Sequence, residues 1–138
     1  MTKRNRAGAE IDLLTWARLR SDLDYMIVAE DTTGAVTVRT VWEGMDEPPG
    51  FPGVMFHTGV AVAGTNRFET VVDSDNEADA LARHQRAVEF AHADTGDPSG
   101  AGRRLRAALA AAATGPGEPH TAADVVTGRQ GPATSGLQ

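Results

Sequence analysis

Apolar and polar residues alternate in three runs along this chain, at positions 36–42, 54–62 and 68–72. In the first run, Val36, Val38, Thr40 and Trp42 would share one face of an extended chain. A period of two is typical of half-buried antiparallel strands. The runs are separated by the proline-rich segment 44–53, which cannot continue a strand, and by turn residues at 63–66. The pattern therefore predicts three successive strands.

Two further elements are expected before these runs. Leu13, Trp16 and Ala17 recur at helical spacing within residues 9–21, with acids near the start of that segment and arginines near its end. Such a distribution favours a short amphipathic helix, with Trp16 as its core anchor. The apolar run 25–29 indicates another strand, and the turn residues that follow it predict a hairpin over residues 24–42.

The clearest helix signal lies in residues 74–93. Ser74 and Glu77 have the spacing of a capping box, and Leu81, His84 and Val88 follow on one helical stripe. Residues 94–138 differ in character, because twelve of them are Gly or Pro and none is aromatic. That composition is typical of disorder, and only residues 102–113 have the propensity to form a short helix.

These elements place the chain in the α+β class. We expect one domain over residues 9–93, a four-stranded antiparallel sheet in the order α-β-β-β-β-α with the helices packed on it. Residues 1–8 are expected to form a disordered basic N-terminus, and residues 94–138 a Gly/Pro/Ala-rich, mostly disordered tail. A body this small has marginal stability alone. Self-association through a sheet face or edge is therefore predicted.

Charge and composition exclude several classes of function. The formal net charge is −6, and residues 7–98 carry seventeen acids against six arginines. An acidic body repels phosphates, so no nucleic-acid partner is expected. The chain has no cysteine and no apolar run long enough to cross a membrane, and its basic start leads into no hydrophobic stretch. A soluble, cytoplasmic protein with no membrane partner is expected.

No pattern of catalytic or metal-binding residues is present. The histidines, at positions 57, 84, 92 and 120, have none of the usual metal-ligand spacings, and the acids around Ser74 fit a helix cap better than a calcium loop. No glycine loop for phosphates and no nucleophile elbow occurs. We therefore predict no metal and no cofactor. One enzymatic alternative remains, in which His57 meets Asp46 or His84 as an acid–base pair.

The best candidates for a binding surface lie around the proline-rich segment. Arg39, Trp42, Glu43 and Asp46 precede that segment, and Phe51 lies within it as a candidate hydrophobic plug. A tryptophan at a strand end can stack a planar ligand or anchor a protein partner. The alternative, which the shared face with Val36 and Val38 favours, is that Trp42 belongs to the core. His57, Arg67, Arg83 and His84 complete the candidate set.

The body resembles a family of small, uncharacterised phage and actinobacterial proteins with the pattern VSTVWLGLDH…GPPLIFETMVF…EEEALAGH. The matching stretches are VTVRTVWEGMD at 36–46, PGVMFHTGV at 52–60 and the segment from RFET at 67–70 into EADALARH at 77–84. The likeness covers about Trp16 to Ala93. His57 stands where the family has Glu, and Glu47 where it has His. The resemblance implies a phage context and no particular chemistry.

Three functions follow as expectations. The first is a non-catalytic phage or prophage accessory protein that acts by binding a protein partner, in the host cytoplasm or as a virion component. The second is a small-ligand binder that sequesters a nucleotide signal of host defence through Arg39, Trp42, Arg67 and Arg83. The third is a small enzyme that uses His57 and Asp46.

Overall fold

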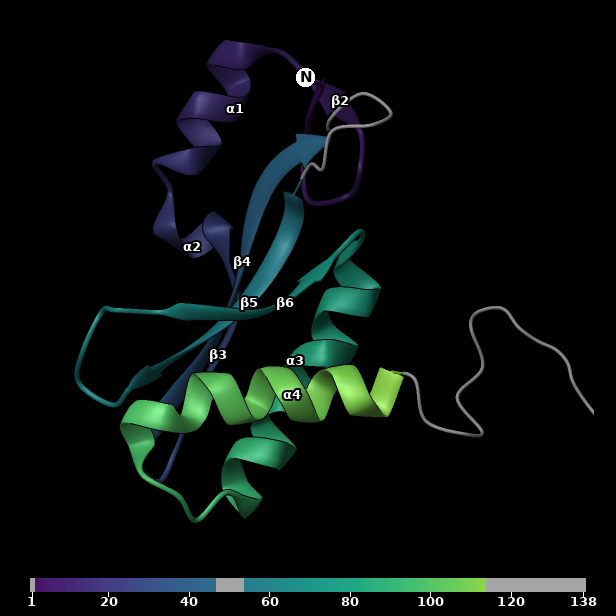
Figure 1. Ribbon diagram of the computed structural model, residues 1–138. Coiled ribbons are helices and arrows are strands. Elements are labelled where there is room, and N and C mark those ends of the chain that lie inside the picture. The colour runs from purple at the N-terminus through teal and green to yellow at the C-terminus, as the bar shows by residue number, and fades with distance from the viewer. Residues whose placement is uncertain (1, 47–53, 114–138) are drawn as a thin grey trace, which may run out of the picture.

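The computed structural model describes residues 2–46 and 54–113 as a single antiparallel sheet with helices packed on it (Figure 1). The strands are β1 (Thr2–Arg4), β2 (Glu10–Ile11), β3 (Ile27–Thr33), β4 (Val36–Asp46), β5 (Val54–Val62) and β6 (Glu69–Ser74). The helices are α1 (Leu13–Arg20), α2 (Leu23–Met26), α3 (Glu77–Ala93), the 3-10 turn η1 (Pro98–Gly100) and α4 (Ala101–Ala113). The α+β class and the antiparallel sheet are confirmed. The predicted number of four strands is wrong, because the described residues alone form a sheet of six.

The centre of the sheet follows the alternating pattern of the sequence. β4 pairs with β3 on one side and with β5 on the other, and a two-residue turn at Gly34 (φ +62°) closes the first hairpin. Val36, Val38, Thr40 and Trp42 are all buried, whereas the residues between them are only partly buried. This is the outcome that a period of two predicts for a sheet with one covered face.

The two additional strands come from the N-terminal residues. β1 forms from residues that were predicted to be disordered, and β2 forms from residues that were predicted to begin a helix. β1 pairs with the far end of β4, with Thr2 opposite Asp46, and β2 pairs with β1. This is possible because β4 continues through Gly44 to Asp46, beyond the point where the sequence predicted it to end. The Arg4 Nε donates to Asp46 Oδ2 at 2.8 Å, which attaches the N-terminal arm to the sheet.

The helix predicted over residues 9–21 is shorter in the structure, where α1 covers Leu13–Arg20. Asp12 caps α1 by accepting from the Thr15 amide, and this hydrogen bond holds the pKa of Asp12 below its usual range. Trp16 faces the sheet as expected, but Leu13 is exposed. Residues 23–26 form the helical turn α2, so the strand predicted from residue 25 begins at Ile27.

The helix predicted after Ser74 is present, with a different cap. Asn76 is the N-cap of α3, and its side chain accepts from the Asp79 amide at 2.8 Å. Ser74 instead ends β6, where it is buried and accepts a hydrogen bond from Arg83. The capping box is therefore wrong in its residues, because Glu77 turns to Arg6 rather than back toward Ser74.

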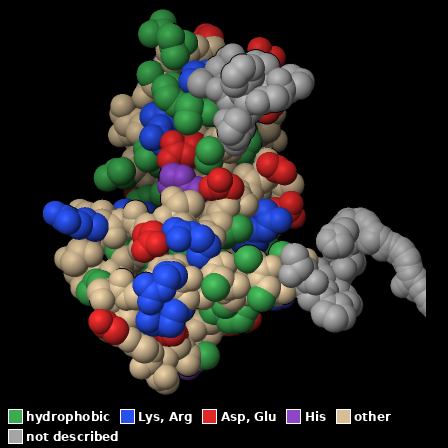
Figure 2. Space-filling view, in the orientation of Figure 1, with side chains coloured by type: hydrophobic (Ala, Val, Ile, Leu, Met, Phe, Trp, Pro, Cys, Tyr) green, Lys and Arg blue, Asp and Glu red, His purple; other side chains and the backbone are tan. Residues whose placement is uncertain are grey.

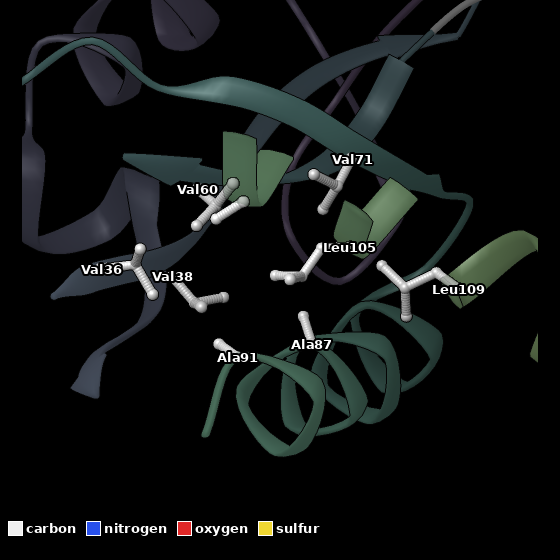
Figure 3. Close-up of a cluster of buried hydrophobic side chains, with 9 residues drawn as sticks. Val36, Val38, Val60, Val71, Ala87, Ala91, Leu105 and Leu109 are labelled. Carbon is white, nitrogen blue, oxygen red and sulfur yellow. The ribbon is translucent and has the colours of Figure 1, made fainter. Parts of the chain in front are cut away.

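The segment 94–113 is part of the folded body, which corrects this part of the predicted disordered tail 94–138; residues 114–138 lie outside the described residues. Helix α4 lies across α3 on the same side of the sheet (Figure 1). Its Leu105 and Leu109 point toward the core residues of the sheet, which include Val38, Val60 and Val71 (Figure 3). Ala87 and Ala91 of α3 close the cluster from below in this view. The predicted helix 102–113 exists, but as a core element.

A second core cluster lies toward the other end of β4. Trp42, Phe56 and Ala80 are fully buried there, and side chains of α1 and α2 pack against them. The Tyr25 ring meets the Trp42 ring edge-to-face, with 5.1 Å between their centroids. The Trp42 Nε1 donates to the Arg4 carbonyl at 2.9 Å, so the core indole has its polar group satisfied.

Among the described residues, no helix is long and apolar enough to span a membrane.

The ion pair between Arg6 and Glu77 makes stability depend on pH. Two hydrogen bonds of 2.8–2.9 Å join the guanidinium to the carboxylate, and they lower the pKa of Glu77. A lowered carboxylate pKa stabilises the fold above pH 4.5, the usual value for glutamate, and this contribution is lost as pH falls through the folded-state pKa. We expect Glu77→Gln to lower the free energy of unfolding at pH 7 and to have little effect at the acid end. Urea unfolding between pH 7 and pH 3 measures this.

The control for this prediction is Glu89→Gln, which neutralises an exposed acid on the same helix. That variant should follow the wild-type pH profile closely. A destabilisation by Glu77→Gln that is equally large at every pH would contradict the prediction, because it would show that the side chain acts through shape rather than charge.

Candidate functional site

The uncovered face of the sheet carries a small polar cluster built on β4 and β5. The Glu43 carboxylate lies 3.4 Å from the His57 Nδ1 and 3.2 Å from an Arg20 nitrogen. Arg20 also donates to the Trp42 carbonyl at 2.9 Å, which fixes the guanidinium against the strand. The antiparallel register places Asp73 of β6 directly opposite His57. His57 therefore has an acid on each side.

This cluster corrects the predicted acid–base pair. His57 was expected to meet Asp46 or His84, but Asp46 pairs with Arg4 and His84 lies in the core. Glu43 takes the place of Asp46 because it lies diagonally across the β4–β5 ladder from His57. The side chains of His57 and Glu43 are 29 % and 17 % exposed, so solvent reaches the ring. A carboxylate-oriented imidazole can transfer protons, but within the described residues no hydroxyl or thiol is bonded to His57 as a nucleophile.

A second polar chain runs through the core, and it has the composition of a catalytic relay without the access that catalysis needs. The His84 Nε2 lies 2.7 Å from Asp31 Oδ2, and its Nδ1 lies 2.9 Å from the Thr40 hydroxyl. The Thr40 and Thr58 hydroxyls are 2.7 Å apart. Both threonines are fully buried beneath α3, so no substrate can approach their oxygen atoms. These hydrogen bonds instead satisfy buried polar side chains, and they connect α3 with β3, β4 and β5.

Arg39 lies on the uncovered face of the sheet. It forms an ion pair with Glu30 of β3, and its guanidinium stacks 4.2 Å above the Phe68 ring. Phe68 in turn lies beside Gly59, where a Cβ atom would come within 3.3 Å of the Phe68 Cβ. Arg39 is therefore a neighbour of the His57 cluster along the same face.

The other candidate residues do not lie with His57 and Arg39 on the uncovered face of the sheet. Trp42 is fully buried, so it cannot stack a ligand and belongs to the core, as its shared face with Val38 favoured. Arg83 donates to the Asp73 carbonyl and to the Ser74 hydroxyl at the far edge of β6. Phe51 lies outside the described residues. Trp42 and Arg83 of the predicted nucleotide-binding set therefore do not lie with Arg39.

A small pocket of about 80 Å³ lies beside Arg67. It is lined by Val60, Ala61, Val62, Arg67, Glu69, Pro98, Ser99 and Gly102. Pockets that enclose drug-sized ligands usually measure about 300–1,000 Å³. This pocket has room for a few water molecules and not for a nucleotide.

The sequence reasoning missed the most exposed apolar surface in the described residues. Leu13, Leu14 and Leu23 are 63 %, 79 % and 66 % exposed, and they belong to the short helices α1 and α2. Figure 2 shows hydrophobic side chains gathered at the surface over α1. The pair Leu13-Leu14 at the start of a helix whose inward residues are Trp16 and Leu19 was the signal that could have revealed it.

Comparisons with known proteins give no match. No protein-family model, no curated protein and no solved structure matches this chain.

Proposed function

We propose that the protein is a non-catalytic interaction module that binds a protein partner through the leucine surface of α1 and α2, defined by Leu13, Leu14 and Leu23. The observation that carries this proposal is the exposure of all three side chains on helices whose opposite sides pack against the sheet. Burying one leucine side chain contributes about 1.5–3 kcal/mol. Leu13 and Leu14, which are neighbours at the start of α1, together with Leu23 at the start of α2, could supply a large part of the affinity of a modest interface.

Two further observations support binding over catalysis. The hydroxyl groups of Thr40 and Thr58, which are hydrogen-bonded in series with His84, are buried, and the pocket beside Arg67 is small. The burial of Trp42 also weakens the alternative of a nucleotide-sequestering protein, because that residue was its stacking platform. The resemblance to small phage and actinobacterial proteins fits an accessory role in a phage or prophage context.

The test uses the double variant Leu13→Ser/Leu14→Ser, with Leu81→Ser as the matched control. Leu81 is 42 % exposed on α3, so it tests the loss of an exposed leucine elsewhere. We expect the wild type to form a complex, either with a protein recovered from the host and then purified or with a second copy, and the double variant to lose at least about tenfold in affinity. Calorimetry with the purified partner and sedimentation velocity of the protein alone measure the two cases.

The serine substitutions should leave the fold intact, because exposed positions change stability by about 0.5 kcal/mol or less. A double variant that binds the partner as tightly as the Leu81→Ser control would overturn the proposal. So would a wild type that remains a monomer and binds no protein in the cell type where it is expressed.

A further inference from the structure

Within residues 2–46 and 54–113 the sheet has two edge strands longer than three residues, and they differ in whether side chains bond to their outward backbone groups. β6 is one edge and β3 is the other, while β2 at the third edge has only two residues. An uncovered edge presents unpaired N–H and C=O groups to solvent, and it can take up another strand. An edge can accept another strand only if other residues do not already bond to these N–H and C=O groups.

The register shows which backbone groups of β3 point outward. A two-residue turn joins Thr33 to Val36, and in such hairpins the closing pair exchanges hydrogen bonds. Bonded pairs then alternate with non-bonded ones, so Thr33 and Asp31 bond to β4 while Thr32 and Glu30 direct their N–H and C=O groups away from it. The Ala63 amide donates to the Ala35 carbonyl at 2.8 Å, which fits the same alternation on the other side of β4.

The same reasoning applied to β6 identifies Thr70 and Asp73 as its outward residues, and both carbonyls are capped. The Arg106 guanidinium donates to the Thr70 carbonyl at 2.6 Å, and Arg83 donates to the Asp73 carbonyl at 3.0 Å. Arginines of α4 and α3 thereby occupy acceptors that an added strand would need. In β3, by contrast, no other described residue bonds to the outward groups of Glu30 and Thr32.

The charge of the β3 edge decides which kind of strand can pair with it. Glu30 and Asp31 are both exposed, and their side chains lie on opposite faces of the strand. A second copy paired along the full length of β3 would be centred near these residues, so that carboxylates would face carboxylates across the junction. Like charges directly opposite one another destabilise a strand pair. Lys or Arg at the corresponding positions of another chain would instead form cross-strand ion pairs.

We propose that β3 is a strand-addition site that takes an extended, basic segment of a partner protein, with hydrogen bonds to the backbone groups of Glu30 and Thr32. Arg39 neutralises Glu30 only from the β4 side, and that carboxylate side chain remains 40 % exposed. His84 occupies one oxygen of Asp31, whose side chain is 55 % exposed. This site is separate from the leucine surface of α1 and α2, so it can be present whether or not that surface binds a protein.

The probe is a synthetic peptide of alternating Lys and Val with the seven-residue length of β3. Titration into the labelled protein, followed by amide NMR shifts and hydrogen exchange, should show binding with the largest changes and the strongest new protection at Glu30 and Thr32. The Thr32→Pro variant removes one outward N–H and no ladder hydrogen bond. It should weaken the peptide by about tenfold, whereas Thr32→Ala should stay within about twofold of wild type.

Two peptide controls keep the test decisive if Thr32→Pro fails to fold. The same peptide with alternate backbone nitrogens methylated keeps its charge but loses its donors, and it should bind wild type at least about tenfold more weakly. A peptide of alternating Glu and Val should not bind. Equal binding by the methylated peptide, changes that avoid β3, or no binding of the Lys-Val peptide at about 1 mM would each overturn the proposal.

Discussion

Replacing Gly44 with alanine is expected to lower the free energy of unfolding by roughly 3 kcal/mol. Gly44 has a φ of +72°, a left-handed conformation that costs an alanine about 1–2 kcal/mol. Its Cβ atom would also lie 2.6 Å from the Arg4 carbonyl oxygen and against the Trp42 ring, and such overpacking costs about 1–3 kcal/mol. Urea unfolding followed by tryptophan fluorescence measures the change.

The matched control is Gly34→Ala. Gly34 has a similar φ of +62°, but nothing lies within 4 Å of the position that its Cβ would occupy. That variant should lose only about 1 kcal/mol, from the backbone conformation alone. The difference of about 2 kcal/mol between the two variants isolates the contact with Arg4 and Trp42. Equal effects of the two substitutions would show that β1 is not held against this part of β4.

Gly44 also shows why the N-terminal strands could not be predicted. Sequence reasoning used this glycine as the end of a strand, because Gly followed by several prolines favours a loop. In the fold, Gly44 lets the chain bulge where the β4–β5 register shifts, between Trp42 and Met45, and leaves room for the Arg4 carbonyl. β1 and β2 have three and two residues, so their pairing depends on tertiary contacts that no local pattern encodes.

The candidate site was predictable only in part, for a similar reason. His84 was placed on the apolar stripe of α3, although it was also a binding candidate, and the alternation along β4 correctly indicated that Trp42 belongs to the core. The partners of His84 could not be found, because Asp31 and Thr40 lie 53 and 44 residues away in sequence. The Glu43–His57 contact is a diagonal cross-strand pair, and its identity depends on a register that the sequence did not define.

Residues 94–113 were predicted to be mostly disordered because their composition resembles that of a disordered tail. α4 contains two leucines among alanines and arginines, so its hydrophobic content is low. The residues that α3 and α4 bring together are small, with Ala87, Ala91, Ala101 and Gly102 all buried. Small side chains let the two helices approach closely, so two leucines are enough to fill the space above the sheet.

Truncating Leu105 tests this account of α4. The side chain is 1 % exposed between α3 and the sheet, so Leu105→Ala should leave a cavity and lower the free energy of unfolding by about 3 kcal/mol, within the 2–5 kcal/mol usual for such changes. Leu14→Ala, at a position 79 % exposed on α1, should change stability by about 0.5 kcal/mol or less. Urea unfolding of both variants, with hydrogen exchange across residues 101–113, makes the comparison. If Leu105→Ala proved as mild as Leu14→Ala, α4 would be a detached helix in solution, and the arginine cap on the Thr70 carbonyl would be lost with it, because Arg106 belongs to the same helix.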